Sequence, residues 1–154
     1  EEAWLTRKSN NESSILMQTI KDDDFSFKAN ELDEAFNELK RIRKCVTAAL
    51  ELKRNEKIIG SSLQAKVTLY ITAESKKILE GIKLAEMCIV SQVELKDISD
   101  KSIDAMSFEE EKIAVVISLA SGEKCERCWT VLPEVDSNPH NLCERCDTVW
   151  QSFQ

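Results

Sequence analysis

Four of the six cysteines in this 154-residue chain fall in two identical Cys-Glu-Arg-Cys turns, and no other feature constrains the fold as strongly. Cys125 and Cys128 form the first turn, and Cys143 and Cys146 form the second after a gap of 14 residues. A Cys-x-x-Cys turn can direct two thiolates at one point, so two turns together supply four sulfur ligands in a tetrahedron. The pattern therefore predicts one structural Zn²⁺, because the protein fills every position and leaves none for water.

Other uses of these cysteines stay open at this point. Two disulfides would need an oxidising compartment, and no secretory signal is recognised at the start of the sequence. A redox-active dithiol normally uses one such motif rather than a matched pair, whereas iron in a rubredoxin-like site would use the same ligand set. His140 could replace a cysteine ligand, but with four cysteines available we expect it in the loop beside the metal.

The composition is typical of a globular, soluble protein, with 42% hydrophobic and 32% charged residues. The longest apolar run, Ile113 to Ile117, is far shorter than the roughly 20 residues that cross a bilayer, so we expect no membrane partner. The net charge of −7 disfavours non-specific binding to nucleic acid. A chain of 154 residues has room for one ordinary domain or two small ones, but not for a large multi-substrate enzyme core.

A long amphipathic helix is predicted from Asn30 to about Lys57, because apolar residues recur there at three- and four-residue steps. Gly60 is expected to be the residue that ends it. The opposite face is basic, since seven cations stand against three glutamates over residues 38–57. Such a stripe is either an ordinary solvated face or a contact surface for nucleic-acid phosphates. Four of its cations cluster at Lys40, Arg41, Arg43 and Lys44.

Downstream of this helix the pattern changes to that of a small α/β unit. Residues 1–30 show no single periodicity and are predicted to be a helix tail, a loop and a linker, with Asp22–Asp24 as a solvated acidic turn. Cys45 and Cys88 are interpreted as small buried hydrophobic residues. The predicted elements are a strand at 63–71, a helix at 72–86, strands at 87–95 and 113–120, and a loop at 96–111.

Three stretches of the chain carry a resemblance to a known family. Gly-Glu-Lys-Cys-Glu-Arg-Cys-Trp at 122–129 and Pro-His-Asn-Leu-Cys-Glu-Arg-Cys at 139–146 resemble the C-terminal zinc module of bacterial-type isoleucyl-tRNA synthetases. Upstream, Ala-Ala-Leu-Glu at 48–51 and the run from Arg54 through Gly60 to Ala65 are similar to the stretch after the anticodon-binding helices of that family. Glu-Glu-Ala-Trp at 1–4 is similar to the end of a helix in the same domain. The matches follow one another in the family's order along nearly the whole chain.

The resemblance implies an α+β fold in three parts: the helical tail of an anticodon-binding domain at 1–60, a small α/β junction at 61–120, and a four-cysteine zinc ribbon or knuckle at 121–154. It implies that the parent enzyme, a class I synthetase, uses ATP to join isoleucine to tRNA-Ile in the bacterial cytoplasm or in an organelle. The His-x-Gly-His and Lys-Met-Ser-Lys-Ser motifs of its catalytic core do not occur in this sequence. We therefore expect a monomeric, non-catalytic piece of a longer protein, with the remainder of the synthetase and the tRNA-Ile anticodon stem-loop as its partners.

The zinc module faces the anticodon loop in the resembling family, which implies tRNA contacts for residues on the two cysteine turns. Trp129 could stack on an unpaired base or cap the small core of the module, and Arg127 could pair with a phosphate or a base edge. Residues 122–147 carry only three cations against six carboxylates, which weakens any electrostatic grip. The predicted tRNA-binding residues are Arg127, Trp129, Lys40, Arg41, Arg43, Lys44 and Arg145, and no catalytic residue is predicted.

Two other functions are compatible with the zinc pattern. DNA-repair glycosylases end in a related four-cysteine module, but they need a catalytic N-terminal proline and a helical DNA-binding region, and the start of this chain shows neither. A zinc-ribbon adaptor that binds protein would suit the acidic composition. Binding to tRNA, to damaged duplex DNA or to neither separates the three hypotheses.

Overall fold

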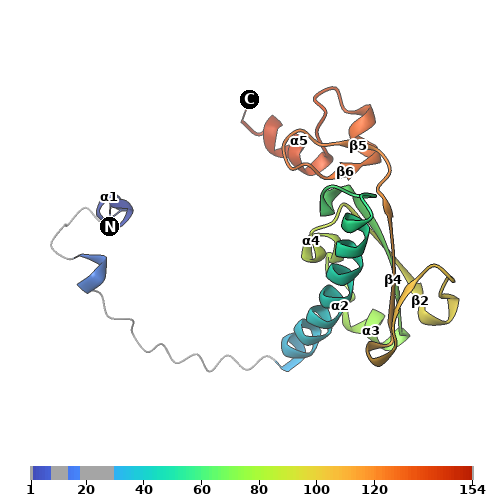
Figure 1. Ribbon diagram of the computed structural model, residues 1–154. Helices are drawn as coiled ribbons and strands as arrows, with labels where there is room; N and C mark the ends of the chain where they lie inside the picture. The colour runs from blue at the N-terminus through green and yellow to red at the C-terminus, as the bar shows by residue number, and fades with distance from the viewer. Residues whose placement is uncertain (1, 8–13, 18–29, 154) are drawn as a thin grey trace.

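The computed structural model describes residues 2–7, 14–17 and 30–153. The first two stretches hold a short helix, α1 (Glu2–Arg7), and a 3-10 turn, η1 (Ile15–Met17), both blue in Figure 1. The predicted acidic turn at Asp22–Asp24 lies outside the described residues. Within the described part of the chain, no helix combines the length and the apolar character needed to span a membrane.

The predicted long helix is confirmed as α2 (Asn30–Asn55), but it ends differently from expectation. Lys57 adopts a left-handed backbone with a φ of 58°, and the Ile58 amide donates back into the last turn at 3.0 Å. This is the helix-ending pattern in which glycine is most common. Gly60 lies further on, where its amide donates to the Gln64 side chain at 2.7 Å. Lys57 therefore closes the helix, and the prediction that Gly60 does so was wrong.

A four-stranded sheet lies beside α2 (Figure 1). β1 pairs in parallel with β2 and antiparallel with β4, and β3 pairs antiparallel with β4 at the edge. A parallel pair needs a crossover connection, which two short helices supply. The strand order is β2-β1-β4-β3, and the elements are β1 (Ala65–Ile71), α3 (Ala73–Ile78), α4 (Leu84–Cys88), β2 (Gln92–Asp97), β3 (Met106–Phe108) and β4 (Ile113–Leu119).

Two of the predicted elements are subdivided in the structure. The helix expected at 72–86 is two helices, because Gly81 takes a left-handed φ of 80° between them. The loop expected at 96–111 contains β3, which at three residues is too short to leave an alternating pattern in the sequence.

The strand predicted to begin at Met87 starts only at Gln92. α4 continues through Cys88, and Ile89 ends it in a left-handed conformation with a φ of 56°. The apolar run there is therefore divided between the last turn of a short helix and the segment that leads into β2. Short apolar runs of this kind cannot be divided between helix and strand by periodicity alone.

One apolar core joins α2 to the sheet. Ile42 of α2 is fully buried in this core together with Val67 and Leu69 of β1, which point to the same face because strand side chains alternate. Full burial of such side chains contributes roughly 1.5–3 kcal/mol each. Cys45 and Cys88 belong to this core, which confirms their interpretation as buried hydrophobic residues.

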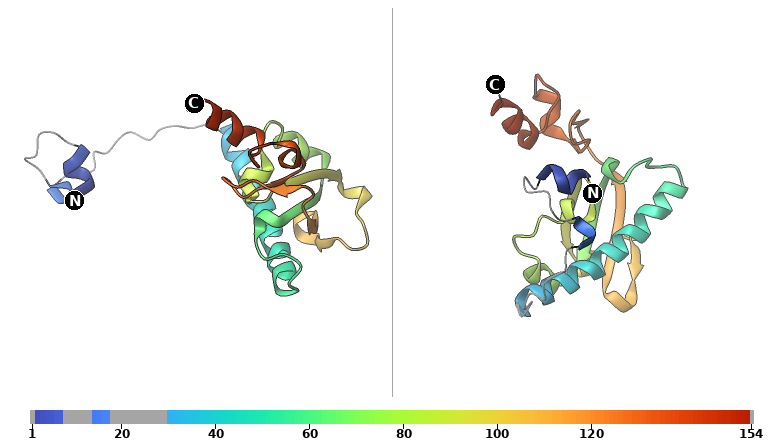
Figure 2. Two further views of the ribbon diagram at one scale, coloured as in Figure 1. Left: turned by 90° about the horizontal axis from the view of Figure 1, so that it is seen from above. Right: turned by 90° about the vertical axis from the view of Figure 1, so that its left-hand side faces the viewer.

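The last part of the described chain forms a module at one end of the sheet, orange to red in Figures 1 and 2. Val135 and Leu142 form its small core together with three of the cysteines. A helix, a small sheet and a four-cysteine module give an α+β fold, as predicted. The elements of the module are β5 (Glu123–Lys124), β6 (Val131–Leu132), the 3-10 helix η5 (Pro133–Ser137) and α5 (Glu144–Gln151).

Candidate metal centre

The first cysteine pair lies on the turn between β5 and β6, which pair as an antiparallel hairpin. The Cys125 amide donates to the Thr130 carbonyl, and the Trp129 amide donates to the Cys125 carbonyl, each at 2.9 Å. Trp129 has a φ of 66°, so the chain turns back sharply after Cys128. The hairpin thereby holds both thiols of its turn on the side of α5.

Glycine is required where the hairpin begins. Gly122 has a φ of 100°, a conformation that residues with a side chain rarely adopt. A Cβ at this position would lie 2.3 Å from the carbonyl carbon of Leu132, which is a prohibitive contact. Close approach of the chain to β6 therefore depends on the absence of a side chain.

The second cysteine pair lies at the start of α5, where Cys143 is the N-cap residue and Cys146 lies in the first turn. Asn138 prepares this start, since its side-chain oxygen accepts from the amides of His140 at 2.8 Å and Leu142 at 3.4 Å. The N-terminal end of α5 therefore carries both cysteines of the second turn.

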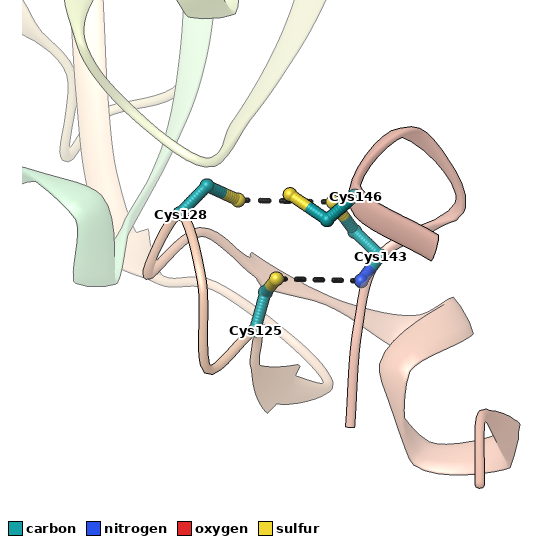
Figure 3. A group of neighbouring side chains, drawn as sticks. All are labelled: Cys125, Cys128, Cys143 and Cys146. Carbon is teal, nitrogen blue, oxygen red and sulfur yellow. Dashed lines mark hydrogen bonds between the residues drawn. The ribbon is translucent and has the colours of Figure 1, made fainter. Parts of the chain in front are cut away.

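The two turns bring all four sulfurs to one point, as Figure 3 shows. The four Sγ atoms lie within 4.8 Å of one another, and those of Cys128 and Cys143 are 3.7 Å apart. Zn–S bonds near 2.3 Å in a tetrahedron would place sulfurs about 3.8 Å apart. A disulfide requires about 2.05 Å, and the cysteines are free. The four cysteines therefore fit one structural Zn²⁺, and the disulfide alternative has no support.

Burial and local hydrogen bonds shift the pKa values of the thiols in opposite directions. Burial raises the pKa of the Cys143 thiol to about 12, and neighbouring cysteines add to the rise. Burial also opposes ionisation of Cys128, but hydrogen bonds from Thr130 outweigh it and lower the pKa of that thiol to about 6. Against its burial, Cys125 has a lowered pKa because backbone amides, including that of Cys143 at 3.4 Å, face its sulfur. A divalent cation would complete the deprotonation of the group.

His140 stands beside this centre rather than in it. Its Nδ1 lies 3.2 Å from an oxygen of Asp147, and its ring lies 4.1 Å from that of Trp150, measured between centroids. Among the described residues, the group able to hold a metal consists of the four cysteines alone. These contacts join His140 to side chains of α5, and its place in the surroundings of the metal or in the loop stays a prediction.

A polar joint that the sequence did not reveal connects the module to the sheet. The buried Ser91, just before β2, donates through its hydroxyl to the Leu63 carbonyl and accepts from the Val131 amide at 2.7 Å. The adjacent Gln92 side chain donates to the carbonyls of Ser121 at 2.7 Å and Val131 at 3.2 Å. The cysteine hairpin is thus tied to the strand that follows α4.

The residues predicted to bind tRNA lie in different surroundings. Trp129 is 62% exposed, and Arg127 is exposed with its guanidinium 3.8 Å from the Cys146 sulfur. Arg145 lies 3.6 Å from Glu86 of α4. Lys40, Arg43 and Lys44 are exposed on α2, whereas Arg41 is half-buried between Glu38 and Glu111.

Comparison with known proteins relates the whole arrangement to one enzyme family. A family model described as "Zinc finger found in FPG and IleRS" matches residues 122–149. The isoleucine–tRNA ligase of Bacillus cereus strain G9842 is 38% identical over 154 residues, covering 97% of this chain and 16% of that protein. That of Bacillus cereus strain B4264 is 47% identical over 113 residues, covering 70% of this chain and 12% of the relative. The isoleucine–tRNA ligase of Desulforamulus reducens is 36% identical over 141 residues, covering 89% of this chain and 15% of the relative.

This chain spans only 12–16% of the length of these relatives, so it corresponds to a segment of them. The relation extends over nearly all of the chain and includes the zinc finger, whose four cysteines converge as a tetrahedral site requires. The chain therefore belongs to the isoleucine–tRNA ligase family, as a C-terminal region that carries the family's zinc finger.

Proposed function

We propose that this chain acts within an isoleucine–tRNA ligase as the part that binds the anticodon stem-loop of tRNA-Ile. The ATP-dependent joining of isoleucine to tRNA would take place elsewhere in the parent protein, in the cytoplasm of a bacterium. We retain 1–60, 61–120 and 121–154 as functional parts of a monomer. The boundary at residue 60 would separate two functions but not two packed units, because α2 shares one apolar core with the sheet.

The observation that carries this proposal is the conformation of Trp129. A left-handed backbone costs a non-glycine residue roughly 1–3 kcal/mol, and Trp129 adopts it with a φ of 66°. The side chain does not recover this cost by burial, since it is 62% exposed. Strain at an exposed aromatic residue favours a role in binding, and stacking on an unpaired base is the contact that an indole makes best.

The metal makes Trp129 and its neighbour suitable for recognition. Arg127 lies between two zinc ligands, so the backbone that carries both side chains is fixed before any ligand arrives. A fixed backbone lowers the entropy lost on binding. Lys124 places its ammonium 5.8 Å from the Trp129 ring, which adds a cation beside the stacking surface.

The cations of α2 would add phosphate contacts. Lys40, Arg43 and Lys44 are exposed and available for this role. Arg41 and Arg145 would have to exchange their carboxylate partners for phosphates, so we expect smaller losses of affinity from their removal. The acidic balance of the zinc module makes the affinity of this chain alone modest and strongly dependent on salt.

The test is a fluorescence titration of the zinc-loaded chain at low salt against three nucleic acids. These are the tRNA-Ile anticodon stem-loop, an unrelated tRNA stem-loop and a damaged DNA duplex. We expect preference for the first, and a loss of about 1–3 kcal/mol for Trp129→Ala. Trp150→Ala is the matched control, because Trp150 is an aromatic residue of the same module and is 37% exposed.

Equal affinity for both stem-loops, or equal losses for the two tryptophan variants, would refute the proposal. Preference for the DNA duplex would instead favour a module of the glycosylase type, and binding to none of the three would favour a protein partner.

A further inference from the structure

A cavity of about 660 Å³ opens between α2, the start of α3 and the 3-10 turn η4 (Glu109–Glu111). This volume lies within the range of about 300–1,000 Å³ that is typical of small-molecule sites. The cavity is far along the fold from the cysteines and shares no lining residue with them. Carboxylates dominate its wall, with the glutamates Glu34, Glu38, Glu74, Glu110 and Glu111 against the two cations Arg41 and Lys112.

One of these carboxylates is buried and incompletely bonded. The side chain of Glu38 is 7% exposed, and its Oε2 accepts from the Arg41 guanidinium. Its Oε1 is buried and has no hydrogen-bond partner. A buried carboxylate oxygen without a donor is costly. Because Glu38 lines the cavity, a ligand there that supplied an N–H donor to this oxygen would relieve the cost.

The cations of the wall do not supply this donor. Arg41 directs Nε to the Glu111 carboxylate at 2.8 Å and Nη2 to the Glu111 carbonyl at 2.7 Å. Among the residues that the structure describes, Glu34, Glu74 and Glu110 have no ion-pair partner. The cavity therefore keeps an excess of negative charge, which repels phosphates and favours a cation.

The spacing of the carboxylates indicates which kind of cation. Divalent metals need several oxygens converging at about 2.0–2.6 Å. In the described part of the chain, three or more such ligands converge only at the cysteines. An organic cation with several N–H donors can reach carboxylates spread over three elements, and Ile78 offers an apolar contact for its methylene groups.

We propose that this cavity binds an organic cation bearing ammonium or guanidinium groups, with Glu38 Oε1 as the innermost acceptor. The cation has two sources of the same chemistry: a free polyamine, or a lysine or arginine side chain from another part of the parent protein. The site shares no residue with the metal centre, but Arg41 of its wall is also one of the predicted tRNA-binding residues.

The test is a titration of the zinc-loaded full chain, followed by NMR shifts of backbone amides that line the cavity, such as those of Asn37 and Ser75. The probes are spermidine, N-acetyl-arginine amide and MgCl₂, each at about 150 mM salt to screen exposed charges. We expect one saturable site for an organic probe. Glu38→Gln should weaken it about tenfold or more, the effect of one lost charge-assisted hydrogen bond.

Two further variants separate a specific loss from misfolding. The rim variant Glu74→Gln/Glu110→Gln alters only exposed side chains and should weaken binding about threefold. If circular dichroism shows that Glu38→Gln is unfolded, the weaker binding of this rim variant tests the proposal in its place. Glu144→Gln, an exposed glutamate of α5, is the matched control and should change nothing.

Binding of spermidine alone would assign the site to a free polyamine, and binding of the arginine derivative alone would assign it to a protein side chain. Both results support the proposal. It is overturned if neither organic probe saturates, if all variants bind equally, or if MgCl₂ is the only probe whose binding Glu38→Gln removes.

Discussion

The sheet with α2 and the zinc module are neighbours in the chain but reach stability by different means. The sheet and α2 share an apolar core of residues far apart in sequence, such as Ile42, Val67 and Val115. Among its described residues, the module buries only Val135 and Leu142 beside its cysteines, which is too little apolar surface for a stable fold. Stability is therefore spread over many contacts in the first region and concentrated at one metal ion in the second.

Removing the metal should have the largest effect and should separate the two regions. Structural zinc contributes about 10–16 kcal/mol of apparent binding free energy in zinc-finger peptides, so a chelator should unfold the module. Indole resonances of Trp129 and Trp150 report the module, and the chain's single tyrosine, Tyr70 in β1, reports the sheet. We expect the indole signals to become those of an unfolded chain while the Tyr70 signal persists.

Restoring one equivalent of zinc should return the indole signals. Cys88→Ala is the control, because it removes a buried thiol outside the site and should leave the zinc content at one per chain. Simultaneous loss of the Tyr70 signal on chelation would contradict the comparison, since the sheet would then depend on the metal as well.

A core substitution should produce the opposite pattern. Ile42→Ala removes a fully buried side chain and should lower the free energy of unfolding of the sheet by about 2–5 kcal/mol. Urea unfolding followed at Tyr70 measures the loss, and zinc content should be unchanged. Leu32→Ala, on the same helix but 70% exposed, should alter stability by no more than about 0.5 kcal/mol. Loss of zinc from Ile42→Ala would show that the two regions unfold together.

The two regions also differ in how much the sequence discloses. The metal ligands were predictable because two cysteines separated by two residues can direct both thiols of a turn at one metal ion. α2 was predictable because its apolar face repeats at the helical period over 26 residues. The break at Gly81 and the late start of β2 were not, because short apolar segments suit a helix and a strand equally well.

Long-range polar contacts could not be predicted from the sequence for a different reason. The partner of Ser91 is Val131, 40 residues away, and that of Arg41 is Glu111, 70 residues away. No local pattern identifies such pairs, so Arg41 was indistinguishable from the exposed cations beside it. The contacts of Arg127 and Trp129 with tRNA stay a prediction, since only a titration with RNA tests them.

Ser91→Ala tests the joint between the two regions and should have an intermediate effect. It leaves the half-buried Leu63 carbonyl and Val131 amide without their partner, which should cost about 1–3 kcal/mol. Hydrogen exchange of the Val131 amide should accelerate while zinc stays bound. Ser121→Ala, which removes an exposed hydroxyl at the same joint, should leave this exchange rate unchanged. Unchanged exchange in Ser91→Ala would mean that the hairpin needs no anchor on the sheet.

The smallest expected effect concerns the ion pair that fastens η4 to α2. A hydrogen bond from Arg41 holds the pKa of the Glu111 carboxyl below its usual value of 4.5. A lowered pKa in the folded state means that the pair stabilises the sheet above that value and that the contribution disappears as pH falls through the folded pKa. Glu111→Gln should therefore be slightly less stable than the parent chain at neutral pH, and the difference should vanish in acid. Urea unfolding at Tyr70 between about pH 3 and pH 7 measures it, and loss of zinc in acid affects both proteins equally. Glu110→Gln, which has no ion pair in the described part of the chain, should show no such difference, and a gap independent of pH would assign the effect of Glu111 to packing instead of charge.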